Sequence, residues 1–182
     1  VTSNVQVEHN TAPESSVTRL YGINKWANEN RIDLVIHIHF NDSPGRDLRY
    51  AGEYSGTALY IPDRQYSNAA ASHALAVPVW KRLTSKLPQS DLPPEKEGII
   101  EDQKLIALGA SNSLDPAALF IEYAYIYEPQ FQDQDIRALW AQEAALQTYL
   151  GVIDFFANEE QPEKTSVLPY FWKKDMKKGM KN

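Results

Sequence analysis

The chain contains no cysteine among its 182 residues. This absence excludes disulfides, thiolate metal sites and cysteine nucleophiles together, so a bound metal would be held by His and carboxylate side chains. The sequence also has no apolar run of about 18 residues or more, so we expect a soluble protein without a membrane-spanning helix. It has neither a G-x-S-x-G motif nor a glycine-rich phosphate-binding pattern, which argues against serine hydrolases and nucleotide-binding enzymes.

Positive charge is scarce outside the C-terminus. The formal net charge is −6, but residues 170–182 carry five lysines and one aspartate, so the rest of the chain sums to about −10. This balance argues against nucleic acid as the main partner. Residues 1–10 have neither a basic start nor an apolar stretch. The protein is therefore cytosolic, or the sequence begins downstream of an export signal.

The hydrophobic pattern predicts an α/β fold with a mostly parallel, twisted sheet covered by helices on both faces. We expect the strand at 34–40 to be central, because it is almost continuously apolar. The other strands are expected at 4–9, 57–61, 105–108 and 117–122, and the helices at about 17–30, 68–86 and 136–153. Pro78 should kink or split the helix at 68–86. Residues 1–160 should form one domain, and residues 161–182 a basic linker or tail.

Two histidines lie at the end of the predicted strand 34–40. His37 and His39 are two positions apart, so both side chains should point to the same face, with His39 nearer the strand's exit. A rigid strand end can hold a neutral imidazole for a metal. The pair fits equally well a buried, hydrogen-bonded histidine beside a surface one. His73 is expected to be a surface or packing residue, and His9 is a weaker candidate ligand.

Glu122 ends the apolar run 117–121, where a carboxylate is costly unless it is paired, hydrogen-bonded or facing a cleft. As a functional residue it would be a general base with a raised pKa. As a structural residue it would cap a helix or pair with an arginine. Because parallel strands deliver their ends to one rim, we expect His39 and Glu122 to lie close together.

Four segments carry a family pattern. Residues 26–28 and 32–41 read WAN and IDLVIHIHFN, 56–60 read GTALY, 72–76 read SHALA, and 116–126 read PAALFIEYAYI. In order and spacing they resemble the zinc-dependent N-acetylmuramoyl-L-alanine amidases, whose patterns are AN…ADLFISIHAN, GVEVYY, SxxLA and PAVLVE-x-GFI. The resemblance covers roughly residues 5–157.

The resemblance implies a bacterial peptidoglycan hydrolase that acts outside the cytoplasm, in the cell wall, in the periplasm or after secretion. It implies Zn²⁺ as cofactor, His39 as a metal ligand, and Glu122 as the catalytic carboxylate that takes a proton from the attacking water. The bond cut would be the amide between N-acetylmuramic acid and L-alanine. The basic segment 171–179 weakly resembles the start of a peptidoglycan-binding module.

The sequence departs from the family pattern at two points. His37 replaces a serine, and the first strand and helix, which carry the other two zinc ligands, have no counterpart after Val1. We therefore expect an N-terminally incomplete domain that binds zinc weakly and exposes one sheet edge. Two alternatives remain open: a catalytically silent cell-wall-binding or regulatory domain of this fold, and a metal-independent intracellular α/β domain in which His39 and Glu122 are structural.

Overall fold

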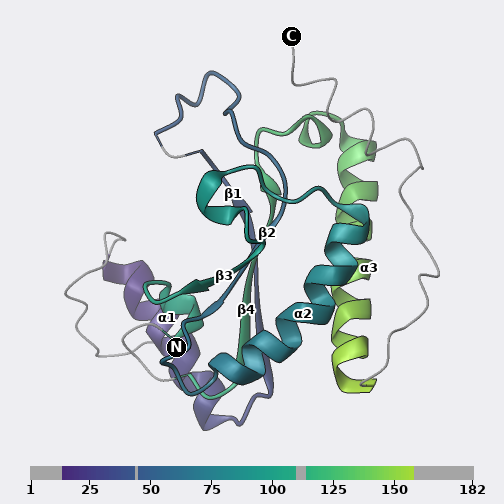
Figure 1. The fold of residues 1–182 in the computed structure, drawn as a ribbon. Helices are drawn as coiled ribbons and strands as arrows, with labels where there is room; N and C mark the ends of the chain where they lie inside the picture. The colour runs from purple at the N-terminus through teal and green to yellow at the C-terminus, as the bar shows by residue number, and fades with distance from the viewer. Residues whose placement is uncertain (1–13, 44, 110–113, 158–182) are drawn as a thin grey trace.

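A computed structural model describes residues 14–43, 45–109 and 114–157. Within them, helices and strands alternate along the chain (Figure 1). The elements are α1 (Glu14–Glu29), β1 (Leu34–Asn41), β2 (Ala58–Pro62), α2 (Ala69–Lys86), η1 (Pro93–Glu95), β3 (Ile99–Asp102), η2 (Ile106–Leu108), β4 (Ala117–Tyr125), η3 (Pro129–Phe131) and α3 (Gln134–Ala157). The predicted strand at 4–9 and the predicted tail at 161–182 lie outside the described residues.

The four strands form one sheet in the order β1-β4-β2-β3. β1 is parallel to β4 and β2 is parallel to β3, but β2 runs antiparallel to β4. The predicted α/β class is confirmed, and the sheet is mixed in direction. The reversal arises because no crossover helix separates β1 from β2: the intervening loop returns the chain at the end where β1 stops.

One face of the sheet carries the main hydrophobic core, beneath α2 and α3 (Figure 1). Leu59 and Ile121, which pair between β2 and β4, are fully buried there against Leu75 of α2 and Trp140 of α3. The two helices approach so closely that a Cβ on Gly151 would lie 2.4 Å from the Val79 Cα. A larger residue at this position would push α3 away from α2.

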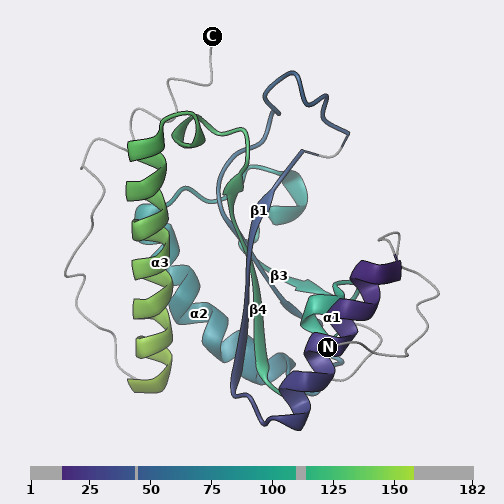
Figure 2. The same cartoon turned by 180° about the vertical axis from the view of Figure 1, so that it is seen from behind.

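The other face is covered only in part. α1 lies on the side opposite α2 and α3 (Figure 2), and its Ala27 packs with Ala107 and Leu108 of η2 against Ala118 and Phe120 of β4. This smaller core covers the amino-terminal half of β4. Past Phe120 the same face carries polar side chains, so the candidate site begins where the apolar cover ends.

The strand expected to be central lies at one edge of the described sheet, so that expectation is wrong for these residues. β1 pairs with β4 on one side only, and Ile38 is 68% exposed and Phe40 42% exposed. An apolar run alone cannot distinguish a strand with two neighbours from an edge strand, because partner choice depends on distant segments. Among the described residues, β1 therefore has one unpaired edge.

One other local expectation is wrong, and a second is tested only in part. Residues 105–108 do not form a strand; η2 is a 3-10 turn that ends at Gly109 with φ of 101°, and the strand beside β2 is β3. Pro78 does not split α2, which is continuous. The backbone hydrogen bond that Pro78 cannot donate would go to Ala74, an exposed residue whose carbonyl can be hydrated instead.

None of the helices in the described ranges combines the length and the hydropathy that a membrane span requires.

The exposed edge predicts self-association through β1. Long, uncharged edge strands template pairing with other chains, and a lysine on such a strand prevents it. Replacing Ile38 by Lys should therefore reduce concentration-dependent association measured by light scattering, while the free energy of unfolding changes by only about 0.5 kcal/mol. Val77→Lys is the matched control, since Val77 is 47% exposed on α2, away from the edge. An equal effect of both substitutions would contradict pairing through β1.

Candidate functional site

His39 and Glu122 are paired neighbours on two adjacent parallel strands. His39 of β1 stands opposite Glu122 of β4 in the ladder, near the carboxyl ends of both strands. Residues that pair in a parallel ladder project to the same face of the sheet. The prediction that these two residues meet at one rim is confirmed. Their chemical roles are a separate question.

The two histidines of β1 share this face. Their ring centroids are 6.5 Å apart, and His39 stacks on Phe120 with a centroid distance of 4.1 Å. Burial lowers the pKa of both imidazoles; His39 lowers the pKa of His37 further, and the backbone of Ala107 opposes this. Both rings are therefore neutral at pH 7, the state in which a ring nitrogen can bind a metal.

Glu122 has the properties of a proton acceptor near neutral pH. Burial raises its pKa to about 7, and the charge of nearby Glu95 adds to this rise. Its Oε2 atom is buried and has no hydrogen-bond partner. A carboxylate with such a pKa is partly ionised at pH 7 and can both accept and return a proton. The raised pKa expected for a functional glutamate is present.

Glu95 organises the rim behind Glu122 and is not among the residues predicted from the sequence. Although it follows two prolines in a loop, its side chain is only 1% exposed. Oε1 accepts hydrogen bonds from Asn41 Nδ2 at 2.8 Å and Tyr60 Oη at 2.6 Å, and Oε2 accepts from Ser90 Oγ and from Tyr125 Oη at 3.0 Å. One carboxylate thereby ties together β1, β2 and β4. No local pattern distinguishes such a residue from an exposed loop glutamate.

The segments after β1 and β4 flank the rim. They contact each other through Tyr127, whose Oη donates to the Tyr54 carbonyl at 2.9 Å and interacts with Ser43 Oγ. Arg46 lies 4.9 Å from the Tyr127 ring centre, and its Nη2 donates to Asp42 Oδ2 at 2.9 Å. These contacts give the long loop after His39 a defined position beside the site.

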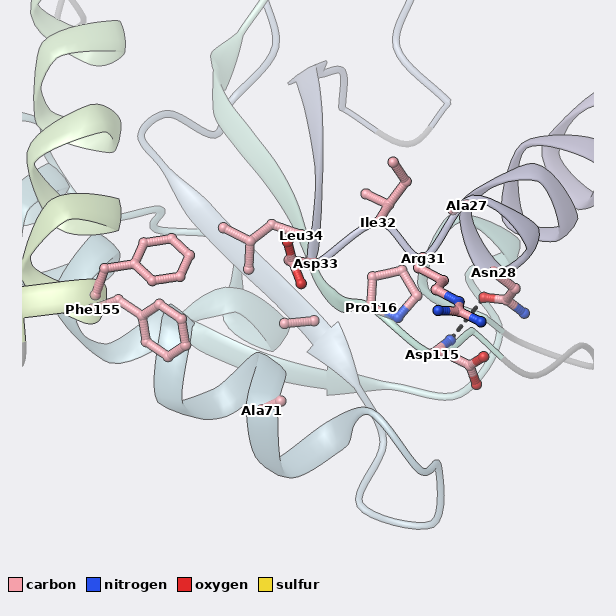
Figure 3. A pocket seen from close by; sticks show the side chains of 12 residues that line it. Ala27, Asn28, Arg31, Ile32, Asp33, Leu34, Ala71, Asp115, Pro116 and Phe155 are labelled. Atoms are coloured by element: carbon pink, nitrogen blue, oxygen red, sulfur yellow. Dashed lines mark hydrogen bonds between the residues drawn. The ribbon is translucent and has the colours of Figure 1, made fainter.

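Two hollows flank the sheet. The hollow near the rim lies on the face opposite His39 and is lined by Phe40, Ile126, Phe131, Gln134, Arg137, Ala138 and Ala141. The other lies at the amino ends of β1 and β4, where Figure 3 shows Phe155 across from Arg31 and Asp115. Neither of these two hollows is lined by His39 or Glu122.

No three His, Asp or Glu side chains within residues 14–43, 45–109 and 114–157 form a group that could hold a metal ion. His39 and His37 are the imidazoles at the rim. His73 is exposed on α2, the helix that packs on the opposite face, as a surface histidine should be. His9 lies outside the described residues. The described residues therefore do not supply a three-ligand metal site by themselves.

The fold is that of known peptidoglycan amidases. An N-acetylmuramyl-L-alanine amidase, Ami1, from Mycobacterium smegmatis superposes with a TM-score of 0.60 at 13% identity, over 77% of this chain and 61% of that one. An N-acetylmuramoyl-L-alanine amidase from Clostridium difficile 630 superposes with a TM-score of 0.55 at 18% identity, over 76% of this chain and 65% of that one. The CwlD amidase of Clostridioides difficile, solved with the GerS lipoprotein, superposes with a TM-score of 0.52 at 13% identity, over 86% of this chain and 72% of that one.

This chain spans less than two thirds of the length of the first two of these proteins. No protein-family model matches it, and no curated protein matches its sequence. At such low identity the likeness establishes a shared fold, and the chemistry has to be argued from the rim itself.

The raised pKa of Glu122 predicts a pH-dependent stability cost. Between the unfolded pKa, near 4.5, and the folded pKa, about 7, the folded state binds more protons, so stability falls as pH rises through this window. The free energy of unfolding of Glu122→Gln should equal that of the unmodified chain at pH 4. At pH 8 it should be higher, by on the order of 2 kcal/mol. Urea unfolding at both pH values measures this. Glu101→Gln should not gain stability at pH 8, because Arg64 lowers the pKa of Glu101.

Proposed function

We propose that this protein is a zinc-dependent peptidoglycan amidase that cleaves the bond between N-acetylmuramic acid and L-alanine. The observation that carries the proposal is the pairing of His39 with Glu122 at the carboxyl ends of β1 and β4. One is a neutral imidazole, and the other is a carboxylate whose pKa lies near 7. A neutral imidazole can bind a metal, and a neighbouring carboxylate can act as a general base in metal-assisted hydrolysis. The shared amidase fold supports peptidoglycan as the substrate class.

Glu122 would act as the general base and then as the general acid. It would take a proton from the water that attacks the amide carbonyl and return that proton to the leaving amine. Its unpartnered Oε2 leaves one carboxylate oxygen available for this exchange. Phe120, stacked on His39, gives the reacting groups an apolar wall on one side.

His39 fits a zinc ligand in its chemistry, because burial against the sheet lowers its pKa and keeps its ring neutral. Bound zinc would polarise the amide carbonyl and promote ionisation of the attacking water. A catalytic zinc usually has three protein ligands. We propose that at least one of them comes from residues outside the described ranges.

The proposed substrate also sets the proposed location. Peptidoglycan lies outside the cytoplasmic membrane, so the protein would act in the cell wall, in the periplasm or after secretion. The loop containing Arg46 and the turn containing Tyr127 border the rim and would contact the glycan or the peptide. Their contacts with each other keep this border in one position.

The test is hydrolysis of purified peptidoglycan. An amidase releases peptides with free alanine amino groups and creates no new reducing sugar ends. Glu122→Gln should slow this release roughly 10²–10⁴-fold, because the amide cannot accept the proton. Bound zinc, measured by elemental analysis, should change little in that variant, and it should fall in His39→Gln.

His73→Gln is the matched control and should keep full activity, since His73 is exposed on α2. Release of reducing ends instead of amines would replace the proposal with a glycosidase. Unchanged turnover by Glu122→Gln would dismiss Glu122 as the base.

A second candidate is a peptidoglycan-binding domain of the same fold without catalysis. The observation that favours it is the lack of a three-ligand group among the described residues. This candidate predicts co-sedimentation with peptidoglycan, no bound zinc and no release of amino groups. The assays above therefore separate the two candidates.

A further inference from the structure

We propose that His37 is a second imidazole ligand at this rim, so that His37 and His39 together bind a divalent transition-metal ion such as Zn²⁺. The inference deepens the proposed function and rests on it for the role of His39. From the sequence, His37 fits a buried, hydrogen-bonded histidine or a residue that orients a metal ligand. The inference assigns it direct ligation instead.

The spacing of the two residues suits joint binding. Alternate residues of a strand project to the same face, so a His-x-His pair presents two imidazoles side by side on one rigid element. In β1 the two ring centroids are 6.5 Å apart with an angle of 45° between the ring planes. His39 is exposed, so its ring is not enclosed by neighbouring side chains on every side.

The buried polar atoms of this corner point to a ligand. His37 Nε2 and Glu122 Oε2 are both buried, and neither has a hydrogen-bond partner. They belong to adjacent strands and to the same face. In the ladder, the pair Ile38–Ile121 lies between the pair that contains His37 and the pair that contains Glu122. Buried polar atoms without partners are rare, and those that occur often mark ion or water sites. A metal bound by His37 would occupy the free nitrogen and lie beside the free carboxylate oxygen.

The surroundings favour a neutral nitrogen ligand over a charged histidine. The Phe120 ring stacks near both imidazoles, with its centroid 4.1 Å from that of His39 and 6.1 Å from that of His37. Of the acidic groups nearby, Glu95 is held by four hydrogen-bond donors on its own network, which leaves Glu122 as the carboxylate facing the pair. Two imidazoles with no thiolate suit Zn²⁺, Co²⁺, Ni²⁺ and Cu²⁺ better than Mg²⁺ or Ca²⁺.

The experiment is a zinc titration of the whole 182-residue chain labelled with ¹⁵N at histidine. Nitrogen resonances of a coordinated imidazole shift strongly on metal binding, whereas those of a ring that only supports a ligand do not shift in that way. We expect coordinated-type shifts for His37 and His39 and none for His73. Isothermal titration should show at least tenfold weaker zinc binding by both His37→Gln and His39→Gln.

The His73→Gln variant is the matched control and should bind zinc as the unmodified chain does. Circular dichroism of His37→Gln checks that the sheet is intact; if it is not, the NMR titration of the unmodified chain decides alone. An unmoved His37 resonance, or a chain that binds no zinc, overturns the inference. Zinc held by both rings in a chain that releases no peptides from peptidoglycan supports the inference and contradicts the proposed function.

Discussion

The parallel register between β1 and β4 is the constraint on which the candidate site depends. It sets His39 opposite Glu122 and His37 opposite Phe120. A slip of one residue would turn the histidines toward the face covered by α2 and α3, where Ile121 and Leu119 now pack. Packing of the apolar residues on that face therefore fixes the strand register. The register in turn fixes the positions of the polar residues on the other face.

The two faces of the sheet differ because they are covered to different extents. On one, α2 and α3 close the core and are joined by a buried ion pair in which Arg82 Nη2 donates to Asp154 Oδ1 at 3.1 Å. On the other, α1 and η2 end their cover near Phe120. Polar side chains can remain at the rim because their backbone is fixed by the closed face beneath. Glu95 adds a second fixation, since three of its four hydrogen bonds reach residues of β1, β2 and β4.

The fold tolerates wide sequence change. The superposed amidases share 13–18% of their residues with this chain over about three quarters or more of its length. At this distance a packing position accepts any apolar residue of suitable size, whereas a base or a ligand must keep its donor atoms. His37 illustrates the freedom that remains, because an imidazole stands where the family pattern has a serine and brings one more nitrogen to the site.

The sequence by itself determined most of the elements and the two leading residues. The helices, β1, β2 and β4 could be predicted because periodicity and apolar runs are local properties, and His39 and Glu122 stood out because each closes such a run. Only the tertiary structure determined that β1 lies at the edge of the described sheet, that β2 runs antiparallel to β4, and that Glu95 is buried. These features depend on which distant segments meet, and burial of a charged side chain depends on donors that no local pattern reveals.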